Sequence, residues 1–152
     1  MSDFPTRGSY QTFSTAAGYP ILLIRGKDDI MRAFHNVCRH RAHPVTLRAA
    51  GTSSVLGCRY HGWNYNSMGK LIQAPNFDAV PGFDRETNGL FEIKISTNQQ
   101  DLVYVNLDAE DEAEARPDTL ETAVAYSDFS LVECWKAKGT FNWKLGGVFW
   151  IT

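Results

Sequence analysis

The stretch "GCRYHGWNYNSMGKLIQAP", residues 57–75, combines a cysteine, a histidine and several turn-forming residues. In it, Cys58 precedes His61 by three positions. The stretch "NVCRHRA", residues 36–42, holds a similar pair, Cys38 and His40, and seventeen residues separate His40 from Cys58. The chain therefore carries two short Cys/His motifs, C-x-H and C-x-x-H, made of residue types that bind metals.

Strand-like segments surround the two motifs. The segments "YPILLIRG" and "IMRAFHN" are rich in apolar and branched residues and are separated by the turn signal "GKDD", which predicts a hairpin over residues 20–36 that leads into the first motif. "SSVLGC" enters the second motif, "HGWNYN" leaves it, and "NSMGK" turns the chain into "KLIQAP". We therefore expect both motifs to lie at hairpin tips.

A further strand is expected at "YQTFST", and "LFEIKIST" and "DLVYVNL" are expected to form a third strand pair, so the fold class is mainly β, an antiparallel sandwich. From Asp108 the chain becomes acidic, and a short, partly helical C-terminal appendage is expected. The domain plan is a β domain over 1–107, an acidic connector with a short helix over 108–128, and an apolar segment over 129–152 that looks like the start of a missing or truncated domain.

Composition excludes several classes of function. The net charge of −2 and a sequence pI of about 6.1 argue against a nucleic-acid partner. The sequence shows neither a signal peptide nor a run of eighteen apolar residues, so a cytoplasmic protein without a membrane partner is expected. Three cysteines are an odd number in such a chain, which favours metal binding over a disulfide framework and leaves Cys134 as a buried free thiol.

Two sulfur and two imidazole donors have two chemical interpretations. One is a tetrahedral structural zinc, as in a zinc-stabilised interaction module. The other is a [2Fe-2S] cluster in which two cysteines hold one iron and two histidines hold the other. Zinc fingers usually pair like ligands on one local turn, whereas each motif here contributes one cysteine and one histidine. That alternation suits two loops that each reach both irons.

At these residues the sequence resembles a known family, the Rieske domain of ring-hydroxylating (Rieske non-haem iron) oxygenase large subunits. The resemblance covers roughly residues 8–107 and continues weakly through "FNWKL". It implies a Rieske-type β-sandwich and a [2Fe-2S] cluster whose inner iron is bound by Cys38 and Cys58. The outer iron would be bound by His40 and His61.

Residues next to the four ligands are expected to surround the cluster. The resemblance makes Trp63 and Tyr65 shielding and hydrogen-bonding groups, and Gly62 would let the backbone pass close to the cluster because glycine has no Cβ. The expected neighbours are Arg39, Arg41, Tyr60, Gly62, Trp63 and Tyr65.

The resemblance also implies a function. The domain would accept electrons from a reductase or ferredoxin and pass them to a mononuclear iron oxygenation site on an oxygenase catalytic domain or chain. The resemblance also allows a homotrimer. The chain has only four histidines, so an oxidoreductase component that is not catalytically complete alone is expected, with no catalytic residue assigned. A stand-alone Rieske ferredoxin and a zinc-stabilised module remain alternatives.

Overall fold

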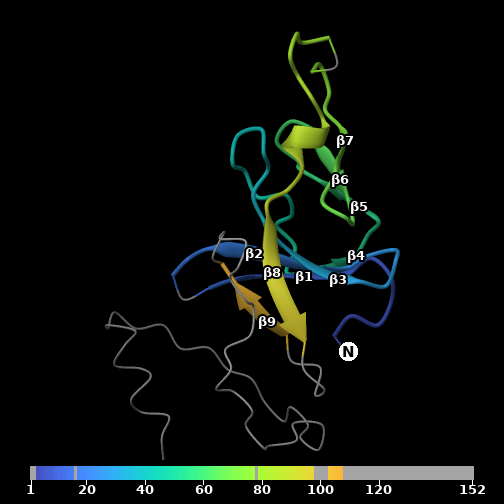
Figure 1. Ribbon diagram of the computed structural model, residues 1–152, viewed down its shortest axis with the longest axis vertical. Coiled ribbons are helices and arrows are strands. Elements are labelled where there is room, and N and C mark those ends of the chain that lie inside the picture. Colours follow the sequence, from blue (N-terminus) through green and yellow to red (C-terminus); the bar gives the residue numbers. More distant parts are fainter. Residues whose placement is uncertain (1–2, 16, 78, 98–102, 108–152) are drawn as a thin grey trace, which may run out of the picture. The chain divides into compact units, whose positions relative to one another are not determined.

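The computed structural model describes residues 3–15, 17–77, 79–97 and 103–107. The chain divides into two compact units, Met1–Glu121 and Thr122–Thr152, and all described residues belong to the first. The described elements are β1 (Ser9–Ser14), β2 (Pro20–Arg25), β3 (Met31–His35), β4 (Ala50–Thr52), β5 (Val55–Gly57), β6 (Asn64–Asn66), β7 (Leu71–Gln73), the 3-10 helix η1 (Glu86–Asn88), β8 (Glu92–Thr97) and β9 (Val103–Asn106) (Figure 1).

The described strands form two antiparallel sheets. The larger has the order β4-β1-β2-β3-β8-β9, and the smaller has the order β5-β6-β7. The predicted hairpin over residues 20–36 is confirmed, since β2 and β3 pair antiparallel with Leu23 opposite Ala33. The predicted pairing of "LFEIKIST" with "DLVYVNL" is also confirmed, as β8 and β9. The mainly β, antiparallel fold class is therefore correct.

Strand β2 lies inside the described fold, with both of its faces covered. Its middle residues, Ile21 to Ile24, are all buried, which explains why the sequence there is a continuous apolar run. Since alternate side chains of a strand point to opposite faces, Leu22 and Ile24 enter one core, while Ile21 and Leu23 enter another. Each such side chain contributes roughly 1.5–3 kcal/mol relative to exposure.

The two cores have different roles. The core that contains Ile21 and Leu23 also contains Phe4 and Ile93, and it has no residue of either motif. The core that contains Leu22 and Ile24 also takes in Cys38, Cys58 and the aromatic residues around them. One face of the large sheet thus supports the two Cys/His motifs.

The small sheet is fixed to the large one through the turn between β6 and β7. Gly69 lies in this turn at φ +77°, and a Cβ placed there would meet Cε1 of Phe34 in β3 at 2.5 Å. The backbone amide of Leu90 donates to the Gly69 carbonyl at 2.8 Å. Only a residue without a side chain fits between the ring and the turn.

One expectation about the motifs is wrong. The second motif does lie at a hairpin tip, between the paired strands β5 and β6. The first motif instead lies on a long connection from β3 to β4, and β4 pairs with β1 rather than with β3. Strand β4 and helix η1 were not predicted from the sequence. The expected helical appendage and the domain boundaries after residue 107 lie outside the described residues.

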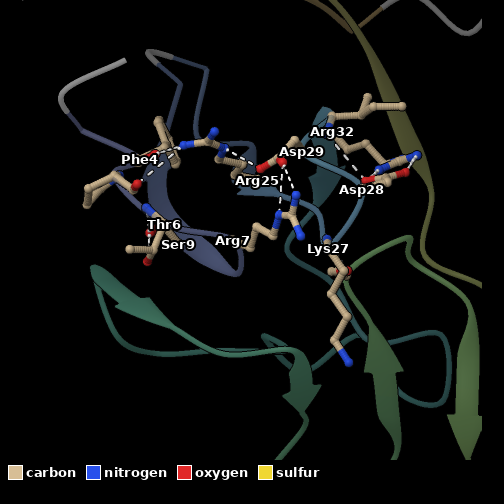
Figure 2. Close-up of polar contacts among 12 residues, drawn as sticks. Phe4, Thr6, Arg7, Ser9, Arg25, Lys27, Asp28, Asp29 and Arg32 are labelled. Atoms are coloured by element: carbon tan, nitrogen blue, oxygen red, sulfur yellow. Dashed lines mark hydrogen bonds and ion pairs between the residues drawn. The ribbon is translucent and has the colours of Figure 1, made fainter.

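The turn between β2 and β3 carries a network of ion pairs (Figure 2). Asp29 binds Arg7 at 2.6 Å and Arg25 at 3.1 Å, and Asp28 binds Arg32 at 2.7 Å. Arg25 also donates to the carbonyl of Phe4 at 3.0 Å. The network ties the N-terminal segment to the hairpin, and Asp29 holds a left-handed φ of 64° within it.

Candidate metal centre

The two motif loops share one backbone plan. In the first loop the Cys38 amide donates to the His43 carbonyl at 2.8 Å, and the Ala42 amide donates to the Cys38 carbonyl at 2.9 Å. In the second loop the Cys58 amide donates to the Trp63 carbonyl at 2.9 Å, and the Gly62 amide donates to the Cys58 carbonyl at 3.0 Å. Ala42 and Gly62 therefore occupy equivalent positions, and both have positive φ, 54° and 72°.

This shared plan presents the two thiols to each other. Cys38 and Cys58 are each only 2% exposed, and neither forms a disulfide. Burial raises the pKa of the Cys58 thiol, and the nearby Cys38 thiol raises it further. Because a thiol with a raised pKa stays protonated at neutral pH, the thiolate form needs a compensating positive charge such as a metal ion.

The two imidazoles also lie together. The ring centroids of His40 and His61 are 4.4 Å apart, with an edge-on orientation. Burial lowers the pKa of His40, and the nearby His61 and Arg41 lower it further, which favours the neutral imidazole that binds metals. His40 is partly covered, whereas His61 is exposed.

The four donors therefore form a cysteine pair and a histidine pair. Among residues 3–15, 17–77, 79–97 and 103–107, no three His, Cys, Asp or Glu side chains are arranged to hold a single metal ion. A tetrahedral zinc site would bring all four donors within about 2.0–2.3 Å of one ion, whereas here each cysteine lies near the other cysteine and each imidazole near the other imidazole. A two-iron cluster needs a thiolate pair on one iron and an imidazole pair on the other, and the donor set fits that group.

A buried polar atom adds to this fit. Nδ1 of His40 is buried and has no hydrogen-bond partner in the described part of the chain. Since buried polar atoms are nearly always bonded, an unpartnered imidazole nitrogen beside a second imidazole is what a metal ligand would leave in a structure without metal.

Tyr65 and Arg39 secure the cysteine side. The hydroxyl of Tyr65, whose side chain is fully buried, lies 3.3 Å from Sγ of Cys38 and accepts the Arg39 amide at 3.1 Å. Burial, and next the contact with Cys38, raise the pKa of Tyr65, so the phenol stays protonated. The guanidinium of Arg39 turns away and lies 3.8 Å above the centre of the Phe91 ring, which anchors the first loop beside β8.

Trp63 and Tyr60 lie against the histidine side. Trp63 is buried and stacks on His40 at 5.1 Å with an interplanar angle of 9°, while its Nε1 has no partner in the described residues. Tyr60 is 57% exposed and packs on His61 at 3.9 Å. Trp63 thus shields the His40 imidazole from solvent, whereas the His61 imidazole stays exposed beside the Tyr60 ring.

Gly62 and Arg41 complete the expected neighbours. A Cβ on Gly62 would meet Cγ of Pro75 at 3.3 Å. Glycine therefore allows both the positive φ at this position and the close packing of the loop against Pro75. Arg41 is exposed, and its influence on the site is the electrostatic effect on His40 described above.

Sequence reasoning missed three residues near the site. The sequence assigned no role to His43, yet its Nδ1 lies 3.9 Å from Sγ of Cys58 and 2.8 Å from the Pro44 carbonyl. Phe77 lies edge-on to His40 at 5.1 Å, and Phe83 packs on Trp63 at 5.7 Å. The phenylalanines come from a loop without periodicity, so no local pattern pointed to them.

Comparisons with known proteins agree with this geometry. Residues 1–84 match the family model described as "Rieske [2Fe-2S] domain". The carnitine monooxygenase oxygenase subunit of Acinetobacter pittii (strain PHEA-2) is 32% identical over 134 residues, 84% of this chain and 36% of that protein. The 2-aminobenzenesulfonate 2,3-dioxygenase subunit alpha of Alcaligenes sp is 38% identical over 111 residues, 71% of this chain and 28% of that protein.

Solved structures show the same likeness. A quaternary ammonium Rieske monooxygenase in complex with L-carnitine superposes with a TM-score of 0.66 at 35% identity, covering 72% of this chain and 30% of that one. A naphthalene 1,2-dioxygenase with indole bound in its active site gives a TM-score of 0.65 at 29% identity, covering 72% of this chain and 25% of that one.

The chain spans only about a third of the length of its carnitine monooxygenase relatives. In the described residues, no helix is both long and apolar enough to cross a membrane. Members of the matched family bind a Rieske-type [2Fe-2S] cluster, and the match to the family covers more than half of this chain. With its paired thiols, its paired imidazoles and this match, the chain belongs to the Rieske [2Fe-2S] domain family.

Proposed function

We propose that this chain is the electron-transfer domain of an oxygenase system, with Cys38 and Cys58 on one iron and His40 and His61 on the other. The domain takes one electron at a time from a reductase or ferredoxin and passes it to a mononuclear iron oxygenation site outside residues 1–107. The observation that carries the proposal is the separation of the donors into a thiol pair and an imidazole pair.

The bound cluster supplies one-electron chemistry at a potential above that of an all-cysteine ferredoxin, because neutral imidazoles replace two thiolates. The chain supports that chemistry in two ways. The Tyr65 hydroxyl and the hydrogen bonds of the loop backbone fix the positions of the two buried cysteines. Trp63 and Phe77 cover His40, while His61 stays exposed, so partners reach the centre from the His61 side.

The substrate of the oxygenase system stays outside this proposal. By their names, the relatives act on chemically unlike compounds, carnitine and 2-aminobenzenesulfonate. The part of the sequence that this chain shares with both relatives therefore indicates the electron-transfer domain and does not identify a substrate.

The test is spectroscopic. The full chain, purified without oxygen or reconstituted with iron and sulfide, is expected to be red-brown, to hold two irons and two sulfides, and to give the electron paramagnetic resonance signal of a mixed-ligand cluster after one-electron reduction. Cys38→Ala and His61→Ala should each abolish that signal. A colourless protein that contains zinc would overturn the proposal.

Matched variants separate ligands from other residues of the same type. Cys134→Ser and His35→Gln should keep the wild-type spectrum. A stand-alone carrier is distinguished by function: under the present proposal, the reduced chain gives its electron to an oxygenase catalytic domain added in the same assay, and oxygenated product forms only when both are present.

A further inference from the structure

Acidic residues are absent from the part of the sequence that holds both motifs. Between Asp29 and Asp78 there is no Asp or Glu, although the whole chain has a net charge of −2. The basic residues of this interval are Arg32, Arg39, Arg41, Arg48, Arg59 and Lys70. The stretch of sequence that holds both motifs is therefore much more positive than the chain as a whole.

A pocket of about 330 Å³ is formed by residues of this stretch and by Tyr10, next to the first motif loop and strands β4 and β5. The residues of its wall that matter here are His43, Thr46, Leu47, Arg48, Ser53 and Arg59. Arg48 and Arg59 are exposed, and in the part of the chain that the structure describes neither is paired with an acidic side chain. The pocket thus offers two unneutralised guanidinium groups beside hydroxyl groups.

The pocket adjoins the metal centre. Its wall includes His43, whose Nδ1 lies 3.9 Å from Sγ of Cys58. Arg59 is the residue after Cys58, and Tyr60, the next one, packs on His61 at 3.9 Å. Tyrosine and arginine are enriched in protein interfaces, and Leu47 adds an apolar side chain that is 71% exposed. A protein seated here would come within a few side chains of both irons' ligands.

We propose that this pocket, defined by Arg48 and Arg59, receives carboxylate side chains of an acidic electron-donor protein. The inference rests on the proposed function and adds the place and the charge of the donor. Charge complementarity selects this occupant, since guanidinium groups pair bidentately with carboxylates and opposite potentials speed association. The net charge of −2 for the whole chain does not suit the repeating phosphates of a nucleic acid.

The test uses the full, cluster-loaded chain and a reduced, acidic plant-type [2Fe-2S] ferredoxin as the probe. The ferredoxin gives up one electron and becomes oxidised, and the chain takes up that electron; transfer in this direction is favourable because plant-type ferredoxins have the lower potential. The second-order rate of transfer, followed by stopped-flow absorbance, should fall as ionic strength rises. The double variant Arg48→Glu/Arg59→Glu should be slower by about tenfold or more at low ionic strength.

Controls separate charge from folding. Arg48→Lys/Arg59→Lys keeps both charges and should keep most of the rate, and Lys27→Glu, which makes the same change of charge outside the pocket, should leave the rate near that of the wild type. All variants should show the wild-type visible spectrum and reach full reduction with a neutral, flavin-based photoreductant.

Two results would overturn the inference while leaving the proposed function intact. One is an unchanged transfer rate in the Arg48→Glu/Arg59→Glu variant with its cluster in place. The other is a transfer rate that does not fall as ionic strength rises, which would mean that opposite charges do not bring the two proteins together. A chain that forms no cluster would instead remove the proposed function.

Discussion

The hydroxyl of Tyr65 lies 3.3 Å from Sγ of Cys38 while it accepts the backbone amide of Arg39 at 3.1 Å. The Arg39 amide can only donate, and a metal-bound thiolate can only accept, so with the cluster bound the single proton of the phenol points to the sulfur. The contact joins a residue of the small sheet to a ligand loop that leaves the large sheet. One hydrogen bond thus ties the assembly of the two sheets to the electronic properties of the cysteine side.

Replacement of Tyr65 by phenylalanine should therefore lower the midpoint potential and keep the cluster. A hydrogen bond to a charged group contributes about 1.5–3 kcal/mol, and only part of it differs between the oxidised and reduced states, so the shift should be on the order of tens of millivolts. Voltammetry of the loaded protein measures it. Tyr10→Phe, a buried tyrosine of the same core without a contact to sulfur, is the control. Equal potentials in the two variants would contradict the assignment.

A second prediction concerns the contact between Gly69 and Phe34. Gly69→Ala adds a methyl group 2.5 Å from the Phe34 ring at a φ of +77°. The strained φ costs about 1–2 kcal/mol and the overpacking about 1–3 kcal/mol, so a loss of roughly 3 kcal/mol in unfolding free energy is expected.

Gly82 supplies the matched control for that prediction. It has a similar φ of +78°, but nothing lies within 4 Å of a Cβ placed on it. Gly82→Ala should therefore lose only the strain contribution, about 1–2 kcal/mol. Denaturant unfolding followed by tryptophan fluorescence compares the two variants, and similar losses in both would show that the turn does not press on Phe34.

The equivalence of Ala42 and Gly62 predicts substitutions of opposite sign. Ala42 has a φ of 54°, so Ala42→Gly should relieve strain and stabilise the loaded protein by about 0.5–1 kcal/mol after the greater freedom of glycine in the unfolded chain is subtracted. Gly62→Ala should destabilise it by at least as much, because its Cβ would also approach Pro75. Thermal unfolding of both variants checks this, and shifts of the same sign would argue against a shared loop plan.

Much of the fold was predictable because the decisive patterns are local. The apolar run in β2, the turn at Gly26–Asp29 and the pairing of β8 with β9 each follow from a few neighbouring residues. The proposed ligands were found the same way, since each motif holds its cysteine and histidine within four positions. Local sequence is sufficient wherever an element is specified by its own residues.

The remaining features depend on long-range pairing. Strand β4, "AGT", has no apolar alternation and exists because it pairs with β1, about forty positions earlier, so the path of the first loop was not predicted. His43 comes near Cys58 only because the two loops face each other. Phe77 and Phe83 reach the site from an irregular loop. Such neighbours become visible only when the strands have been placed.

The ion pairs of the β2–β3 turn predict how stability responds to acid. Two hydrogen bonds from Arg32, at 2.9 and 2.7 Å, are the largest cause that lowers the pKa of Asp28, to about 2 (Figure 2). The pKa of Asp29 is lowered as well, chiefly by its hydrogen bond from Arg7. A carboxylate whose pKa falls on folding stabilises the protein at pH values above its unfolded pKa, near 4, and loses that contribution as the pH falls towards 2.

Asp28→Asn should therefore be less stable than the wild type at neutral pH, and the difference should shrink as the pH falls from about 4 to 2. The comparison cancels contributions common to both proteins, including loss of the cluster in acid. High salt should reduce the neutral-pH difference, because the pair is partly exposed and is screened. Denaturant unfolding of both proteins across this range measures the effect. If the difference in unfolding free energy stays constant from pH 7 to 2, the charge of the Asp28 carboxylate does not contribute to the stability of the turn.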